Sequence, residues 1–157
     1  MLAAACVFGA DRATKWLVLG SLVPGERIEL TSFLNLVLVY NRGVSFGLLS
    51  ELGALAPWAL VLLTVAVALL LLLWLWREPR RASRLAIWAI LGGAAGNLFD
   101  RLAYGAVVDF LDFHLGRYHW PAFNFADMAV VCGAALLLFD SFFARPAVAD
   151  AGKEGRP

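Results

Sequence analysis

Charged side chains are scarce in this chain of 157 residues, and their scarcity excludes an ordinary soluble domain. Asp, Glu, Lys and Arg make up 16% of the residues, whereas 62% are hydrophobic and the mean hydropathy is +0.77. Soluble domains carry about 25% charged residues. The composition therefore predicts an integral membrane protein, and the length is that of a single domain over residues 1–157.

Cysteine and histidine are equally sparse, with two residues of each kind. Cys6 and Cys132 both fall in apolar segments, where a thiol behaves as a small hydrophobic side chain. His114 and His119 lie in a loop between apolar segments, where we interpret them as ordinary polar residues. We therefore expect no disulfide, no metal site and no cofactor.

Long apolar segments define the expected architecture. The run from Leu55 to Trp76 contains no charged residue, and as a helix it would be about 33 Å long, enough to cross a hydrocarbon core of about 30 Å. Three weaker segments lie at about residues 1–20, 83–100 and 124–143. The first lacks the basic start of a signal peptide and is interpreted as a retained helix. The sequence therefore predicts a membrane α-helical fold with four transmembrane helices.

The basic residues give the orientation. Four arginines crowd the linker between the second and third spans: Arg77, Arg80, Arg81 and Arg84. The positive-inside rule makes this linker cytoplasmic. Four spans then place both termini in the cytoplasm, which agrees with the basic residues after the last span: Arg145, Lys153 and Arg156. Residues 21–54 and 101–122 would lie outside.

The outer segments contain β-type patterns. Residues 33–40 form a β-rich stretch that leads into a turn at 41–43, and residues 107–111 form a second strand pattern. The apolar content of the first stretch favours contact with lipid. We therefore expect a small extracytoplasmic β-sheet that rests on the membrane surface.

Two aspartates, Asp100 and Asp127, sit at the outer ends of the third and fourth spans. Measured from Arg84 and Arg145, they lie about 24 Å and 27 Å along their helices, which is a similar depth. Ionisable groups in a membrane are costly and suggest function. Two apposed carboxylates share one proton, so that one activates water and the other protonates the leaving amine, as in an aspartic protease.

Each aspartate follows an asparagine, Asn97 or Asn124, by three residues, which is one helical turn. Other interpretations stay open. The run from Gly92 to Gly96 would suit helix packing as well as close approach of a substrate, and Asp100 would also suit an ion pair with Arg101. A small proton-coupled transporter would use the aspartates as a relay, and a membrane scaffold would use neither.

Five motifs resemble those of the bacterial lipoprotein signal peptidase family, or signal peptidase II, and occur in the family order. They are Asp11–Lys15, Asn41–Gly47, Gly92–Arg101, Val107–Phe110 and Phe123–Asp127. The resemblance implies an aspartic endopeptidase of the bacterial inner membrane. Its substrates would be prolipoproteins that carry a diacylglyceryl group, cleaved just before the lipidated cysteine.

The resemblance also implies roles for particular residues. Asp100 and Asp127 would be the catalytic pair, near the outer face of the membrane. Supporting or substrate-binding positions would be Asp11, Lys15, Asn41, Arg42, Gly43, Asn97, Arg101, Asp109, Asn124 and Ala126. From the residues alone, Asp11 and Lys15 are also spaced for an intrahelical ion pair. The guanidinium N–H groups of Arg42 could donate hydrogen bonds to the backbone carbonyls of a peptide substrate. Expected partners are prolipoproteins and membrane lipids but no nucleic acid, and we expect a monomer.

Overall fold

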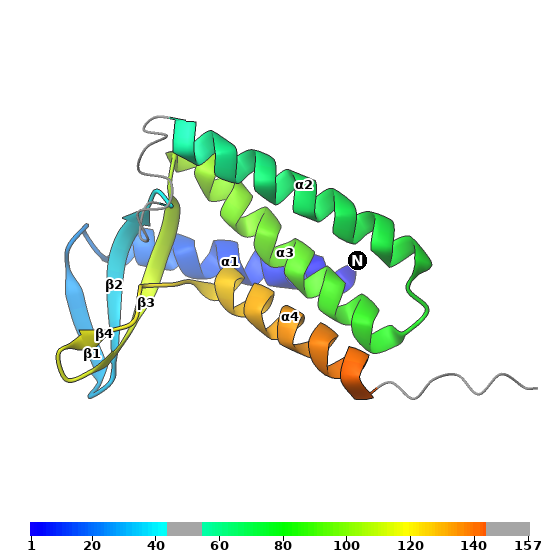
Figure 1. The fold of residues 1–157 in the computed structure, drawn as a ribbon. Helices are drawn as coiled ribbons and strands as arrows, with labels where there is room; N and C mark the ends of the chain where they lie inside the picture. Colours follow the sequence, from blue (N-terminus) through cyan, green and yellow to red (C-terminus); the bar gives the residue numbers. More distant parts are fainter. Residues whose placement is uncertain (44–54, 144–157) are drawn as a thin grey trace, which may run out of the picture.

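The computed structural model describes residues 1–43 and 55–143, in which four helices carry a small sheet at one end (Figure 1). The helices are α1 (Leu2–Ser21), α2 (Ala56–Arg77), α3 (Arg81–Tyr104) and α4 (Phe125–Phe143). The strands are β1 (Arg27–Thr31), β2 (Leu34–Asn41), β3 (Val107–Leu115) and β4 (Tyr118–His119). The start of α1, the end of α4 and the linker between α2 and α3 all lie opposite the sheet (Figure 1).

The four helices match the four expected segments in position. Two of them, Pro57–Arg77 and Phe125–Phe143, are long and apolar enough to cross a membrane by length and composition. Helices α1 and α3 carry more charge, and much of it is buried inside the bundle, as for Asp11, Lys15 and Asp100. Their polarity is therefore explained by contacts within the protein.

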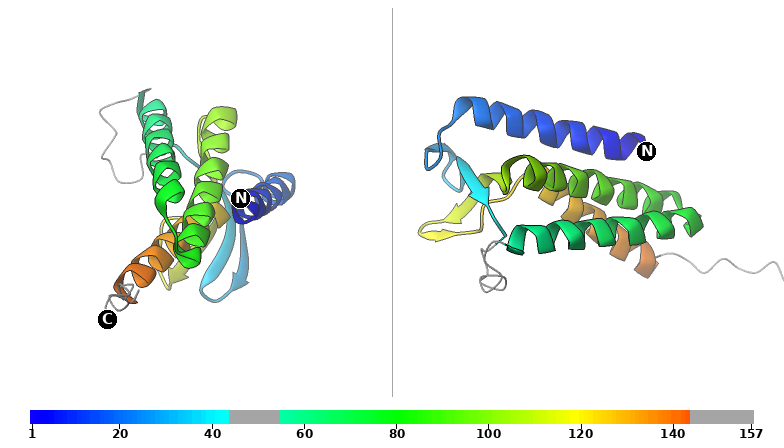
Figure 2. Two further views of the ribbon diagram at one scale, coloured as in Figure 1. Left: turned by 90° about the vertical axis from the view of Figure 1, so that its right-hand side faces the viewer. Right: turned by 90° about the horizontal axis from the view of Figure 1, so that it is seen from above.

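Helix α3 is the centre of the bundle. It packs against each of the other three helices, most extensively against α4, and it lies between α1 and α2 in both views of Figure 2. A Cβ atom at Gly92 would lie 2.6 Å from the carbonyl oxygen of Ala4 in α1, and one at Gly93 would lie 2.5 Å from that of Ala126 in α4. The small residues of α3 thus serve helix packing, which was one of the two interpretations that the sequence left open.

The sheet is antiparallel, with the order β1-β2-β3-β4. It confirms both expected strand regions, and β3 continues beyond the expected end to Leu115. In the register of β2 and β3, Val39 faces Asp109 and Tyr40 faces Val108. Val44–Gly47, the rest of the expected turn motif, lies outside the described residues.

An apolar cluster fixes the sheet to the end of α1. Its buried members are Val18, Leu22, Leu38, Val108 and Phe110. Chain reversal between α3 and β3 occurs at Gly105, whose φ of +68° is a left-handed conformation that suits glycine. After this reversal β3 packs against the end of α3, which brings the polar residues of β3 beside the helix bundle.

Polar contacts close the opposite end of the bundle. Arg80 bonds Glu78 at 2.9 Å and contacts the Asp140 carboxylate at 3.3 Å, and Ser83 donates a hydrogen bond to the same carboxylate. The hydrogen bond from Arg80 is the main cause that lowers the pKa of Glu78 below its ordinary value. Arg145, Lys153 and Arg156, the expected basic residues after α4, lie outside the described residues.

The close packing of α3 on α4 predicts that adding one methyl group at Gly93 lowers the stability of the fold. We expect Gly93→Ala to lower the free energy of unfolding by about 1–3 kcal/mol, because its Cβ meets backbone that cannot move aside easily. Gly9→Ala is the matched control, since nothing lies within 4 Å of a Cβ there, and alanine favours the helix. Thermal unfolding of both variants in detergent, followed by circular dichroism, measures the difference. Equal melting temperatures would contradict this account of the packing.

Candidate functional site

A buried polar cluster lies where the bundle meets the sheet. Its fully or almost fully buried members come from α1, α3, β3 and the start of α4: Asp11, Lys15, Asn97, Asp100, Asp109 and Asn124. Buried polar groups of this kind need partners, because burial removes them from water. These six are half of the twelve residues singled out from the sequence, and they lie far apart along the chain.

Asp100 is held by cations from α1. It is 0% exposed, its Oδ2 atom lies 2.7 Å from Nζ of Lys15, and its Oδ1 atom pairs with the guanidinium of Arg12. The backbone N–H of Val108 also donates to Oδ2, at 3.1 Å. The ion-pair partners of Asp100 are thus Arg12 and Lys15, and the pairing with Arg101 that the sequence left open does not occur among the described residues. Both carboxylate oxygens are engaged in structural contacts.

Asp127 lies in the first turn of α4 and is half-buried. Its backbone N–H donates to Oδ1 of Asn124 at 3.0 Å, and its Oδ2 atom accepts the N–H of Asn124 at 3.2 Å. These reciprocal bonds form a capping box with asparagine and aspartate in place of the usual residue types. Nδ2 of Asn97 donates to Oδ1 of Asp127 at 2.7 Å. The N-terminus of α4 and these hydrogen-bond donors thus all face the carboxylate.

Asp127 opens onto a cavity of about 250 Å³ between α2, α3 and α4. Its polar lining residues are Asp127, Asn97, Arg101 and Thr64, and the other lining side chains are apolar. The apolar lining residues include Leu63, Val67, Leu71, Ile90 and Val130. The cavity therefore combines a carboxylate at one end with space for apolar groups.

Asp109 lies on β3 and is 1% exposed. Its carboxylate accepts hydrogen bonds from Nδ2 of Asn124 at 2.6 Å and from Nδ2 of Asn41 at 2.9 Å. Burial raises its pKa to about 6, the bond from Asn41 opposes that rise, and the charge of Asp127 adds to it. Asp109 also lines a cavity of about 520 Å³ together with Asn41, Arg42 and Pro121.

Asn124 connects these two aspartates. Its amide nitrogen donates to Asp109, and its amide oxygen accepts the backbone N–H of Asp127. The structure therefore couples Asp127 to Asp109, whereas the sequence analysis paired Asp127 with Asp100. Equal depth along two helices does not determine the direction of a side chain, and Asp100 is directed into ion pairs with α1.

The other expected residues support this cluster. Asp11 pairs with Lys15 at 3.0 Å, which confirms the intrahelical ion pair, and its Oδ1 atom accepts the backbone N–H of Ala126 at 3.0 Å. Gly43 donates its N–H to Oδ1 of Asn41 at 2.8 Å and has a φ of +80°, a conformation that suits glycine. The side chain of Arg42 is exposed.

The sequence underestimated two features of this region. Arg12 was not named as a site residue. It forms an ion pair with Asp100, and this pair explains why α1 carries a charge at that position. His114 and His119 stack with ring centroids 5.0 Å apart, and His119 contacts Asp112 at 2.9 Å. His114 lies on β3 and His119 on β4, and these contacts join the two strands.

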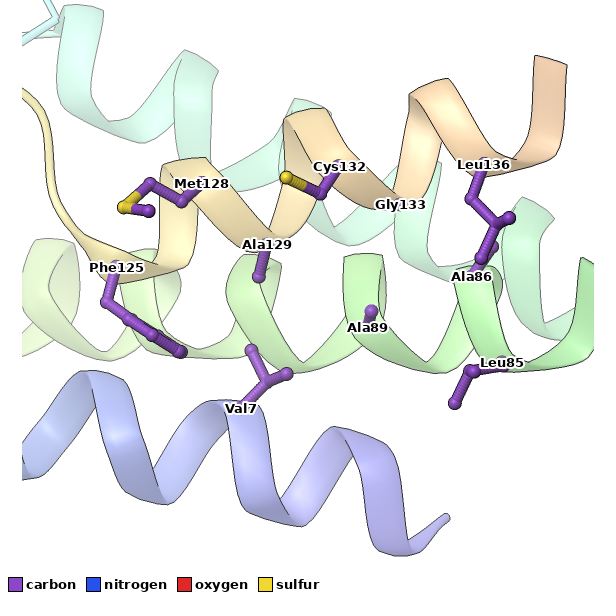
Figure 3. A pocket seen from close by; sticks show the side chains of 10 residues that line it. All are labelled: Val7, Leu85, Ala86, Ala89, Phe125, Met128, Ala129, Cys132, Gly133 and Leu136. Atoms are coloured by element: carbon purple, nitrogen blue, oxygen red, sulfur yellow. The ribbon is translucent and has the colours of Figure 1, made fainter. Parts of the chain in front are cut away.

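A third cavity, of about 350 Å³, lies between α1, α3 and α4 (Figure 3). The side chains drawn there are apolar or weakly polar, including Val7, Phe125, Met128 and Cys132. None of its lining residues is an acid or a base. Asp127 and Asp109 thus line the other two cavities and not the one in Figure 3.

Comparison with known proteins identifies a family with this arrangement. Residues 3–143 match the family model described as signal peptidase (SPase) II. A lipoprotein signal peptidase of Burkholderia thailandensis is 47% identical over 131 residues, which cover 83% of this chain and 79% of the relative. The lipoprotein signal peptidase of Burkholderia multivorans is 49% identical over the same shares of both chains.

Solved structures agree with the sequence comparison. A bacterial membrane enzyme determined by the in meso method at 1.9 Å resolution superposes with a TM-score of 0.79, at 27% identity and over 92% of each chain. A second, at 2.3 Å resolution, has a TM-score of 0.75 at 26% identity, and covers 99% of this chain and 93% of that one. The chain belongs to the signal peptidase II family.

Proposed function

We propose that this protein is an intramembrane aspartic endopeptidase that removes signal peptides from diacylglyceryl-modified prolipoproteins. It cleaves just before the lipidated cysteine, and Asp109 and Asp127 are its catalytic pair. The observation that carries the proposal is the electrostatic coupling of these two carboxylates across Asn124. Family membership supports the peptidase activity and the class of substrate.

The proposed reaction needs one ionised and one protonated carboxyl group. The ionised member takes a proton from water, and the resulting hydroxide attacks the peptide carbonyl carbon. The protonated member donates a hydrogen bond to the carbonyl oxygen and stabilises the tetrahedral intermediate. A proton then passes to the nitrogen of the leaving amine, the C–N bond breaks, and the signal peptide ends in a new carboxyl group. Protein carboxyl groups supply each of these proton transfers.

Asp109 suits this pair better than Asp100 does. The raised pKa of Asp109 lets it hold a proton up to about pH 6, and Asp109 borders a cavity. Asp100 contacts two cations and a backbone N–H, so both of its carboxylate oxygens are already engaged. Asp100 would therefore hold Lys15 and α1 in place, and the pairing inferred from the sequence is replaced in this proposal.

The proposed topology has all four helices spanning the bacterial inner membrane within one domain, residues 1–157. The arginine-rich linker and the start of α1 share one end of the bundle, which would be cytoplasmic. The end of α4 lies there too, so that both termini would face the cytoplasm. The sheet would rest on the outer surface with the acid pair just beneath it.

The substrate would lie across two regions. The apolar cavity between α2, α3 and α4 begins at Asp127 and suits hydrocarbon groups of a lipid-modified substrate. The larger cavity beside Asp109 includes the exposed Arg42, whose guanidinium suits peptide carbonyls. A monomer with membrane lipids around it contains all of these parts. The alternative of a proton-coupled transporter has no support from the comparisons.

The first test of the proposal is cleavage by purified protein in detergent. We expect a diacylglyceryl-modified prolipoprotein to be cut before its lipidated cysteine and its unlipidated twin to remain intact. Asp109→Asn and Asp127→Asn should each lower kcat by about 10²- to 10⁴-fold, because each removes a proton-transfer group. Mass spectrometry of the released signal peptide measures site and rate.

Asp100→Asn separates the two candidate pairs. We expect it to lower kcat by no more than about tenfold while it reduces thermal stability, because it weakens a buried ion pair without removing a reacting group. Circular dichroism in detergent checks that all three variants are folded. If folded Asp100→Asn were inactive and Asp109→Asn active, the pair would be Asp100 and Asp127 instead.

The raised pKa of Asp109 also predicts a dependence of stability on pH. Between its ordinary value of 3.8 and about 6, the folded protein holds a proton that the unfolded chain has released. The free energy of unfolding should therefore fall as pH rises through this interval, by at most about 3 kcal/mol. Asp109→Asn should lack this component. Denaturant unfolding of both proteins at pH 4, 5, 6 and 7 measures it, and parallel curves would rule it out.

A further inference from the structure

We infer that Lys15 is a positioning residue for the acid pair, and that through Asn97 it holds Asp127 as the ionised member. The inference deepens the proposed function and rests on it. Lys15 belongs to α1, on the far side of Asn97 from the acid pair, and the proposed reaction does not use it directly. Its contacts nevertheless determine which way the Asn97 amide faces.

The Lys15 ammonium has three partners and is 0% exposed. Its Nζ atom lies 2.7 Å from Oδ2 of Asp100, 3.0 Å from Oδ2 of Asp11 and 3.0 Å from Oδ1 of Asn97. An ammonium has three N–H donors and no acceptor. The atom of Asn97 that faces Lys15 must therefore be the amide oxygen.

The orientation of this amide decides whether Asn97 can donate a hydrogen bond to Asp127. With its oxygen on Lys15, Asn97 directs its amide nitrogen to Oδ1 of Asp127 at 2.7 Å. A reversed amide would place its oxygen against the carboxylate, which only a protonated Asp127 tolerates. Because a charged donor polarises the groups that follow it, Lys15 also strengthens the bond from Asn97 to Asp127.

Asn124 completes the directional chain. Its amide oxygen is fixed by the backbone N–H of Asp127, so its nitrogen must donate, and it does so to Oδ1 of Asp109 at 2.6 Å and to Oδ1 of Asn97 at 3.2 Å. Both asparagine amides thus have one orientation each. Of these two amides, only that of Asn97 accepts a hydrogen bond from a charged donor, the Lys15 ammonium.

The charge of Lys15 also lowers the pKa of Asp109, but burial outweighs this effect and leaves that pKa raised to about 6. Arg101 on α3 interacts with Asp127, Asp109 and Asp100, whereas Arg12 and Asp11 on α1 are engaged in the ion cluster. Arg42 at the end of β2 is exposed. Asp127 has the N-terminus of α4, and Asp109 makes no ion pair among the described residues. Asp127 is therefore the base that activates water, and Asp109 carries the proton.

The test replaces an ion pair by neutral side chains of similar size. The double variant Asp11→Asn with Lys15→Met removes one positive and one negative charge, so the net charge of the cluster is unchanged. Asparagine in place of Asp11 keeps an oxygen that can accept the backbone N–H of Ala126. We expect kcat to fall about tenfold with KM within about twofold, and the acid limb of the pH profile of kcat to move about one unit higher. Asp11→Asn alone, which retains Lys15, should leave that limb in place.

A second measurement does not depend on activity. The infrared carboxylate band that is lost in Asp127→Asn belongs to Asp127, and we expect it to develop at higher pH in the double variant than in the wild type. Should the double variant lose activity only in proportion to unfolding, with the acid limb and the band unmoved, Lys15 would be merely structural and the inference overturned. Absence of cleavage by the wild type would instead refute the proposed function, and the band would still decide the role of Lys15.

Discussion

A lysine without access to water is the constraint on which the structure depends. Lys15 is tolerated inside the protein because Asp11, Asp100 and Asn97 supply acceptors for all three of its N–H groups. These partners come from two helices, so the ammonium fixes α1 against α3. Asp11 extends the connection to α4 through the backbone N–H of Ala126. The charges that make α1 and α3 poor membrane segments by composition are the same ones that join them inside the bundle.

Close helix packing makes these contacts possible. At Gly96 a Cβ would lie 2.3 Å from Oδ2 of Asp11, so only glycine leaves room for that carboxylate between α1 and α3. Gly93 brings α3 close to the backbone of Ala126, and so brings Asn97 within hydrogen-bonding distance of Asp127. A larger residue at either position would separate the helices and lengthen the polar contacts of the site.

The three aspartates near the sheet differ because their surroundings differ. Asp100 faces two cations, Asp127 lies at a helix N-terminus with two further donors, and Asp109 is buried on a strand with amide partners. The first environment joins Asp100 to α1 through ion pairs. The other two place a carboxylate at a helix N-terminus beside one whose pKa is raised by burial, and the proposed acid–base chemistry uses this difference.

The sequence by itself determined the class of protein, the four helices and the two main strand regions, because apolar periodicity and charge act locally along the chain. It also selected Asn97, Asn124 and Asp127, since each lies in a compact motif. Which carboxylate meets Asp127 was decided by tertiary structure alone. Asp100 lies in α3 and Asp109 follows it closely in sequence, but the turn at Gly105 brings β3 back to Asn124, while ion pairs with α1 hold Asp100. Residues distant in sequence supply these contacts, so no local pattern distinguishes the aspartate that forms ion pairs from the one that lies beside Asp127.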